Sequence, residues 1–333
     1  MTVVARSTVF GPFGLLAVLA MLCVACGGDD TPGDGTDAGV EPGTDAGGGT
    51  DAGGTTDAGG ITDAGGTDAG PEDAGMSMVD AGPPTSTGCV DGDGIPEGEN
   101  TFMLEGRSRR FIMRLPTDYT RDRAWPLVFA LHGNGGSTSY WDTTTGSRNI
   151  RAVLADHAVL IVAEAIDGQW RDYSMPESTW PARIESELLY FEELISRAKA
   201  ELCIAEGAIF SMGFSGGGSF SGVLGCRRTD IRAIAVGGSV IYFDEADCVG
   251  TPAAWIAIGT MELTGGRAAY RDWFRDRAGC AETSMPTEPD PPCVAYDGCG
   301  EGTPVHYCQH PAGHIWPDFG SEAMWDFFAP LVP

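Results

Sequence analysis

Six short, largely apolar runs constrain the fold of this chain more than any other feature of its sequence. They lie at residues 126–132, 158–163, 208–213, 231–236, 254–258 and 304–308. Runs of this length and composition are typical of strands that are buried on both faces of a parallel sheet. The sequence therefore predicts a mostly parallel sheet whose two faces are both covered.

Helical patterns separate these runs, at residues 150–157, 184–202, 219–225, 268–277 and 321–328. A hairpin is expected before them, because two strand-like stretches flank Glu105-Gly106. Alternation of strands with helices predicts an α/β fold with a central sheet and helices on both faces. The 245 residues from Cys89 to Pro333 suit one such catalytic domain.

A low-complexity segment precedes this domain and spans residues 27–88. It holds eight Asp-Ala-Gly triplets and 13 acidic residues, but no Phe, Trp, Tyr, Leu, Lys, Arg or Cys. Such a segment buries too little apolar surface to offset the entropy of ordering, about 1–2 kcal/mol per residue, so we expect a disordered linker. About half of the net charge of −27 lies in it, and the rest of the chain is also acidic, which argues against a nucleic-acid partner.

The first 26 residues have the features of a secretory signal. Arg6 is the only charged residue before Asp29, and an apolar run follows from Leu15 to Val24. The run ends in Cys23-Val24-Ala25-Cys26-Gly27, which resembles the bacterial lipoprotein signal, with Cys26 as the lipidated residue and Cys23 where Leu is usual. We expect an exported protein that contacts a membrane only through this lipid anchor, with a plainly cleaved signal peptide as the alternative.

Eight cysteines remain in the predicted domain: Cys89, Cys203, Cys226, Cys248, Cys280, Cys293, Cys299 and Cys308. An even number of cysteines in an exported domain favours disulfides, and eight allow 105 connectivities. Local pairs such as Cys226–Cys248 and Cys293–Cys299 are hypotheses. Zinc binding is the competing interpretation, but the spacings form no paired C-x-x-C units.

The sequence Gly213-Phe214-Ser215-Gly216-Gly217 matches G-x-S-x-G at the point where a strand should turn into a helix. Glycines two positions before and after the serine let the chain turn tightly, because larger side chains would clash there. The turn would expose Ser215 as a nucleophile and aim the Gly216 N–H at a developing oxyanion. A flexible loop without chemistry is the alternative.

A serine nucleophile needs a base, and in enzymes with this motif the order along the chain is serine, acid, histidine. Only His306, His310 and His314 follow Ser215; we select His314 because it lies in a loop after the last predicted strand. Their spacing of four also permits a metal site, although Pro311 and Gly313 interrupt any helix. Glu262, after the run 254–258, is the expected acid. The other candidates are Asp244, Asp247 and Asp272.

His132-Gly133-Asn134-Gly135-Gly136 follows the first apolar run, where such enzymes provide the second oxyanion N–H. We assign this role to Asn134, with Gly133 as the alternative. His132 is expected to be structural.

Four motifs in order resemble those of secreted feruloyl esterases and poly(3-hydroxybutyrate) depolymerases, a group of α/β-hydrolase serine esterases. They are Leu131–Gly136, Gly213–Gly217, Gly259–Glu262 and Gly313–Pro317, and the cysteine-containing tail around 278–308 is similar to the feruloyl esterase type. The likeness covers residues 88–330. One departure is Glu262, where the family usually has Asp.

The resemblance implies an extracellular carboxylesterase that works through an acyl-enzyme without metal or cofactor, on feruloyl or related esters of plant polysaccharide. Trp141, Trp170, Trp180 and Trp316 could line an aromatic or sugar site, although tryptophans in such loops more often pack. The alternatives are a polyester depolymerase and a surface lipoprotein that binds polymer without catalysis.

Overall fold

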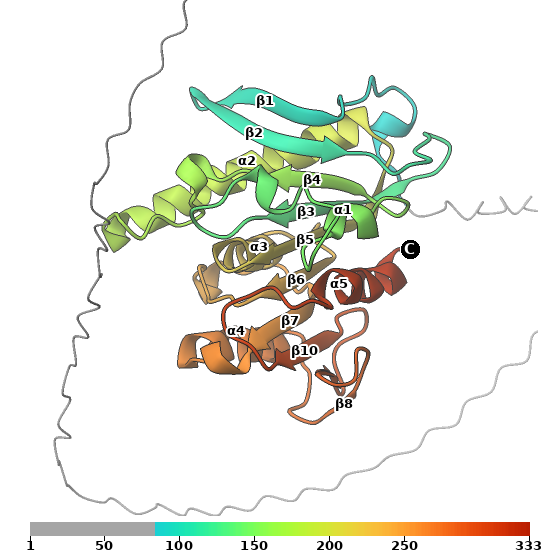
Figure 1. Cartoon of the computed structure of the whole chain (residues 1–333). Helices are drawn as coiled ribbons and strands as arrows, with labels where there is room; N and C mark the ends of the chain where they lie inside the picture. Colours follow the sequence, from blue (N-terminus) through green and yellow to red (C-terminus); the bar gives the residue numbers. More distant parts are fainter. Residues whose placement is uncertain (1–83) are drawn as a thin grey trace, which may run out of the picture. The chain divides into compact units, whose positions relative to one another are not determined.

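A ten-stranded sheet dominates the computed structural model, which describes residues 84–333 (Figure 1). The predicted signal peptide and Cys26 lie outside these residues, as does the linker up to residue 83. The strands follow the order β1-β2-β4-β3-β5-β6-β7-β10-β9-β8. Six neighbours, from β4 to β10 in that order, are parallel, and the strands at both edges are antiparallel. The predicted α/β fold is confirmed.

Each predicted apolar run forms one of the parallel strands. These are β3 (Trp125–Leu131), β4 (Val159–Ala163), β5 (Ile204–Phe214), β6 (Ala233–Gly237), β7 (Ala253–Gly259) and β10 (Val305–His310). The expected hairpin consists of β1 (Gly98–Leu104) and β2 (Arg107–Arg114). Two short strands, β8 (Ser284–Pro286) and β9 (Cys293–Tyr296), were not expected from the sequence.

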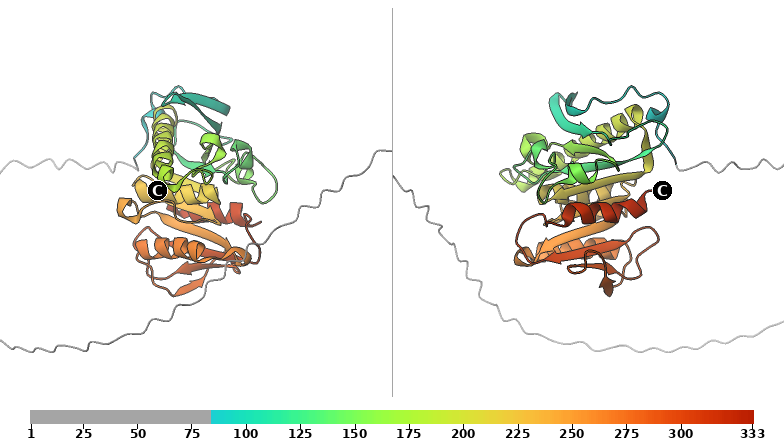
Figure 2. Two further views of the ribbon diagram at one scale, coloured as in Figure 1. Left: turned by 90° about the vertical axis from the view of Figure 1, so that its left-hand side faces the viewer. Right: turned by 45° about the vertical axis from the view of Figure 1, so that its right-hand side comes forward.

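Helices cover both faces of the sheet. Side chains of α2 (Trp180–Glu201), α3 (Gly216–Arg227) and α4 (Gly265–Arg277) belong to one core, and those of α1 (Ile150–Val153) and α5 (Gly320–Phe328) to the other. Helix α5 crosses in front of the sheet in Figure 1 and in the right-hand view of Figure 2. The helix predicted at 150–157 is shorter than expected, ending at Val153.

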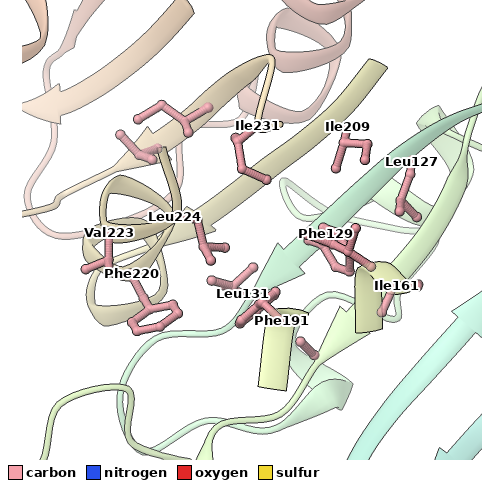
Figure 3. Close-up of a cluster of buried hydrophobic side chains, with 14 of the residues drawn as sticks. Leu127, Phe129, Leu131, Ile161, Phe191, Ile209, Phe220, Val223, Leu224 and Ile231 are labelled. Carbon is pink, nitrogen blue, oxygen red and sulfur yellow. The ribbon is translucent and has the colours of Figure 1, made fainter. Parts of the chain in front are cut away.

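Strand β3 shows how the sheet divides the two cores. Leu127, Phe129 and Leu131 pack with α2 and α3 on one side (Figure 3), while Val128 and Ala130 face the other core. Successive side chains of a strand point to opposite faces, so a continuous apolar run supplies both cores at once.

Four disulfides use all eight cysteines of the described residues: Cys89–Cys203, Cys226–Cys248, Cys280–Cys299 and Cys293–Cys308. The pairing Cys226–Cys248 is confirmed, and Cys293–Cys299 is wrong. Cys293 lies directly opposite Cys308 in the antiparallel β9–β10 pair, a register that the spacing along the chain does not reveal.

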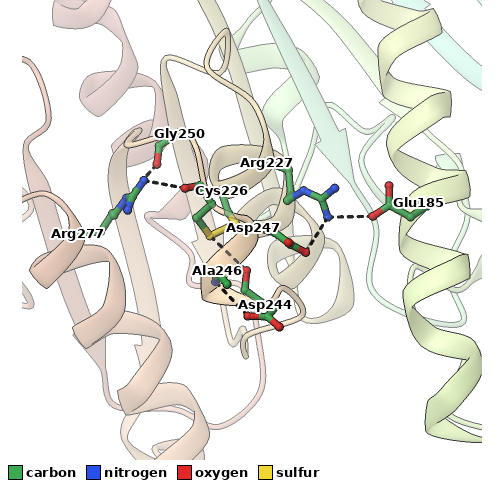
Figure 4. Close-up of a disulfide and its surroundings, with 9 residues drawn as sticks. Glu185, Cys226, Arg227, Asp244, Ala246, Asp247, Gly250 and Arg277 are labelled. Atoms are coloured by element: carbon green, nitrogen blue, oxygen red, sulfur yellow. Dashed lines mark hydrogen bonds and ion pairs between the residues drawn. A yellow bond between two sulfur atoms is a disulfide. The ribbon is translucent and has the colours of Figure 1, made fainter.

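The disulfide Cys226–Cys248 fastens the loop after β6 to the end of α3 (Figure 4). Arg227 contacts Glu185 of α2 at 2.9 Å and Asp247 of the loop at 3.4 Å. Arg277 of α4 donates to the Gly250 carbonyl at 3.2 Å. The loop is thus tied directly to α3 and α4, and Arg227 also links α3 to α2.

Residues 84–88, which the sequence predicts to be part of the linker, pack on the folded unit. The Ser86 hydroxyl is buried, donates to the Leu202 carbonyl at 2.6 Å and accepts from the Ile204 N–H at 2.8 Å. Among residues 84–333, none of the helices has the length and apolar composition needed to cross a bilayer.

Candidate active site

Ser215 occupies a sharp turn between β5, which ends at Phe214, and α3, which begins at Gly216. Its backbone adopts φ 57° and ψ −123°, a conformation that non-glycine residues adopt only when the surroundings impose it. The Ser215 N–H donates to the Gly237 carbonyl at 2.7 Å and holds the turn against β6.

The glycines flanking the turn have no room for a side chain. A Cβ on Gly213 would lie 2.5 Å from the Gly217 carbonyl carbon. A Cβ on Gly217 would overlap the carbonyl oxygens of Leu131 and His132 in the next strand and loop. The steric reason inferred from the motif therefore applies in the structure.

His314 and Glu262 meet Ser215 at the carboxyl edge of the sheet. The His314 Nε2 atom lies 2.8 Å from the Ser215 Oγ, and Nδ1 on the other side of the ring hydrogen-bonds to Glu262 Oε2. Since a carboxylate only accepts, the ring proton belongs on Nδ1, which leaves the Nε2 lone pair facing the serine hydroxyl. The three residues thus form one continuous hydrogen-bonded chain.

Glu262 is buried, whereas the His314 side chain is 41% exposed. Burial opposes ionisation of Glu262, but hydrogen bonds from His314 and from the Gly259 N–H, together with nearby positive charge, outweigh it and lower its pKa. The Gly259 N–H lies 3.2 Å from Glu262 Oε1. The carboxylate is therefore held ionised beside the imidazole.

Arg267, which the sequence did not point to, also contacts the acid. Its Nε lies 3.1 Å from Glu262 Oε2 and 3.2 Å from the Gly238 carbonyl. Its Nη2 lies 3.3 Å from His314 Nδ1. The first turn of α4 thus places a guanidinium against the carboxylate.

Among the described residues, none of the other candidates for base and acid hydrogen-bonds to the Ser215 hydroxyl. His306 packs against the Phe327 ring and His310 is buried in β10; burial lowers the pKa of both.

The alternative acids have other partners. Asp247 pairs with Arg227, and Asp272 pairs with Arg271 and Arg275. Asp244 caps the turn at Ala246. Within residues 84–333, no cluster of His, Cys, Asp or Glu has the arrangement of a metal site.

His132 is a structural residue of the loop after β3, as expected. It is fully buried, its Nδ1 lies 2.8 Å from the Gly133 carbonyl, and its Nε2 accepts from the Ala165 N–H at 3.2 Å. Burial lowers its pKa, so the ring stays neutral and joins the loop to the end of β4.

The structure brings Asn134 next to Gly216. A Cβ on Gly216 would lie 2.5 Å from the Asn134 side-chain carbon Cγ, and a Cβ on Gly133 would lie 3.5 Å from the Ser215 Cβ. Among the described residues, neither the Asn134 N–H nor the Gly216 N–H has a hydrogen-bond acceptor. Both N–H groups are therefore free of acceptors within the described part of the chain.

Three of the four tryptophans named above pack in the cores. Trp141, Trp170 and Trp316 are all at most 3% exposed. Trp180, at the start of α2, is half-buried and lines a cavity of about 420 Å³ together with Met175 and Arg183. Of these four tryptophans, Trp180 is therefore the one whose side chain solvent reaches.

The parallel sheet, the covering helices and a strand–serine–helix turn define an α/β hydrolase, and known relatives place this chain among ester-hydrolysing enzymes. It is similar to feruloyl esterase D of Neurospora crassa, 26% identical over 276 residues that cover 73% of this chain and 90% of the relative. It is also 26% identical to feruloyl esterase B of Piromyces equi over 246 residues, which cover 66% of this chain and 44% of that relative. The predicted resemblance to feruloyl esterases is confirmed.

A solved ferulic acid esterase from Anaeromyces mucronatus shares the fold. It superposes with a TM-score of 0.51 and 13% sequence identity, over 72% of this chain and 93% of the other. No family model matches the chain.

Proposed function

We propose that this chain is an exported serine carboxylesterase that hydrolyses feruloyl or related esters of plant polysaccharide through an acyl-enzyme. The observation that carries the proposal is the unbroken hydrogen-bonded chain from Ser215 Oγ through His314 to Glu262. A hydroxyl, an imidazole and a carboxylate in this order are the three parts of a serine hydrolase triad.

In the proposed acylation step, Ser215 Oγ attacks the ester carbonyl carbon while His314 Nε2 takes the hydroxyl proton. Glu262 stabilises the resulting imidazolium through Nδ1. The carbonyl oxygen becomes an oxyanion, to which the N–H groups of Gly216 and Asn134 donate. The tetrahedral intermediate then collapses, the bond to the alcohol oxygen breaks, and His314 gives its proton to the departing alcohol.

Deacylation repeats these steps with water in place of the serine hydroxyl. His314 takes a proton from the water, whose oxygen attacks the acyl carbon. Collapse of the second intermediate breaks the bond to Ser215 Oγ, which recovers its proton from His314. The acid leaves, and the enzyme returns to its starting state.

The substrate class rests on the relatives, whose names specify feruloyl esters. The accessible site suits an ester attached to a polymer, because His314 is exposed and Ser215 half-buried. Export is supported by the four disulfides, which persist in oxidising compartments. Lipidation at Cys26 and an acidic tether complete the proposal of an enzyme held at the cell surface.

A fluorophosphonate probe tests the nucleophile on the full chain. We expect it to label wild type and Ser139→Ala, an exposed control serine, but not Ser215→Ala. Labelling retained in Ser215→Ala would refute the assignment. A folded wild type that is never labelled would favour a polymer-binding protein without catalysis.

A panel of feruloyl, acetyl and hydroxybutyrate esters tests the substrate class. We expect the highest kcat/KM for the feruloyl esters. Preferential hydrolysis of hydroxybutyrate oligomers would identify a polyester depolymerase instead, with the same triad.

A further inference from the structure

The side chain of Asn134 has hydrogen-bond partners in two other loops. Its Oδ1 accepts from the Trp170 N–H at 3.0 Å. Its Nδ2 donates to the Arg171 carbonyl at 3.2 Å and to the Tyr242 hydroxyl at 3.3 Å. The amide therefore joins the loop after β3 to the loops that follow β4 and β6.

This amide lies directly against the nucleophile turn. A Cβ added to Gly216 would lie 2.9 Å from Asn134 Nδ2 and would overlap Oδ1. Gly216 and the backbone of Asn134 are the two proposed oxyanion donors. The Asn134 amide thus packs against the residue that directly follows the nucleophile.

The side chain of Tyr242 contacts Arg171 and Tyr173, which fix its position. The Arg171 guanidinium lies 3.9 Å from the centre of its ring, and its hydroxyl accepts from the Tyr173 hydroxyl at 2.7 Å. Tyr173 in turn accepts from Arg171 Nη2 at 2.7 Å. Burial raises the pKa of Tyr242, so the hydroxyl stays neutral at any pH at which the enzyme would work.

We propose that Tyr242 is a positioning residue of the oxyanion site, whose hydroxyl fixes the Asn134 amide and thereby the Asn134 backbone N–H beside Gly216. This inference rests on the proposed function. Tyr242 acts through Asn134 and contributes no atom to the reaction. Because the oxyanion forms only in the transition state, a misplaced donor should lower kcat and leave ground-state binding nearly unchanged.

Tyr242→Phe tests the inference, because it removes only the hydroxyl. Removing an oxyanion donor outright typically costs on the order of 10²–10³ in rate, and we expect a smaller loss of about 10-fold in kcat because the donor is displaced and not removed. KM should change less than 2-fold, an estimate that follows from unchanged ground-state binding. Affinity for a trifluoromethyl ketone, which forms an oxyanion on Ser215, should fall by the same factor as kcat/KM.

Tyr190→Phe is the matched control, since its buried hydroxyl donates to the Arg110 carbonyl at 2.6 Å, between α2 and β2. We expect it to lower the melting temperature and to leave kcat and ketone affinity unchanged. If Tyr242 were only structural, Tyr242→Phe would also lower the melting temperature and leave kcat and ketone affinity unchanged. That result would overturn the inference.

A double-variant cycle distinguishes action through Asn134 from independent action. Asn134→Ala removes all three side-chain hydrogen bonds and keeps the backbone N–H. In this background, Tyr242→Phe should have no further effect on kcat. Additive losses would contradict the inference. If wild type neither reacts with fluorophosphonate nor hydrolyses esters, the proposed function fails first, so the two failures are distinguishable.

Discussion

At the scale of single residues, the contacts of Glu262 show how the site accommodates glutamate, whose side chain is longer than that of aspartate. One oxygen accepts from His314 and contacts Arg267, and the other accepts from the Gly259 N–H at 3.2 Å. We predict that Glu262→Gln lowers kcat by about 10³–10⁴, because a neutral amide neither fixes the tautomer of His314 nor stabilises its charged form. Steady-state kinetics on an ester substrate measure the loss.

Asp272→Asn is the matched control, since Asp272 was an alternative acid and pairs with Arg271 and Arg275. It should retain wild-type kcat. An equal loss of kcat in the two variants would contradict the proposed role of Glu262.

The lowered pKa of Glu262 also links its charge to folding. A carboxyl group that ionises more readily in the folded state contributes stability above its unfolded pKa of about 4.5. That contribution is lost as the pH falls through the lower folded value. We predict that wild type exceeds Glu262→Gln in free energy of unfolding at pH 7, and that the difference shrinks by about pH 3. Urea unfolding at the two pH values provides the comparison, and a constant difference would contradict the linkage.

Sequence reasoning identifies the residues of the proposed triad because a local signal marks each one. Ser215 has glycines two positions before and after it, His314 follows Gly313, and Glu262 closely follows a buried strand. Arg267 and Tyr242 carry no such signal. Arg267 reaches His314, 47 positions away, and Tyr242 reaches Asn134, 108 positions away, so only the folded chain brings them together.

At the scale of secondary-structure elements, the junction of β5 and α3 depends on the absence of side chains. We predict that Gly217→Ala destabilises the protein by about 3 kcal/mol and abolishes labelling of Ser215, because its Cβ would overlap backbone oxygens of the adjacent strand and loop. Thermal unfolding and probe labelling report the two effects.

Gly266→Ala in α4 is the control for this change. Apart from its own helix and chain neighbours, the one described atom within 4 Å of its Cβ would be Val240 Cγ1, at 3.6 Å. We expect a change within about 1 kcal/mol, in the stabilising direction, because alanine favours helix. Similar losses at both positions would point to a general intolerance of substitution.

The elements that sequence predicts well are those buried on both faces, because burial requires continuous apolar residues. All seven residues of β3 and of β7 are buried, and both strands were expected. Strand β8 is exposed along its whole length and precedes a proline-rich turn, so nothing in its composition separates it from a loop. Its pairing depends on β9, which β10 and the Cys293–Cys308 disulfide hold in place.

A buried ion pair joins two elements on the hairpin side of the sheet. Arg109 of β2 lies 2.5 Å from Glu187 of α2, and their side chains are 3% and 0% exposed. We predict that Glu187→Leu costs about 3–5 kcal/mol, because it leaves the guanidinium buried without its partner, whereas Arg109→Leu/Glu187→Leu recovers most of the loss. Urea unfolding of the three proteins tests this, and a double variant as unstable as the single one would refute it.

At the scale of the whole molecule, the disulfides differ most in the length of chain they enclose. Cys89–Cys203 spans 114 positions, including the hairpin, β3, β4 and α2, whereas Cys293–Cys308 spans 15. In the chain-entropy description, a cross-link stabilises by restricting the unfolded state, by about 4.7 kcal/mol for a 100-residue loop and about 3 for a 15-residue loop. The Cys89–Cys203 disulfide should therefore contribute more to the free energy of unfolding than Cys293–Cys308 does.

We predict that Cys89→Ala/Cys203→Ala loses more free energy of unfolding than Cys293→Ala/Cys308→Ala, by about 1–2 kcal/mol. Cys203 directly precedes β5, at the opposite end of that strand from Ser215, so the first variant should keep full fluorophosphonate labelling below its unfolding transition. Urea unfolding under oxidising conditions gives the two free energies. The reverse order would mean that packing of β9 on β10, and not restriction of the unfolded chain, determines how much each disulfide contributes.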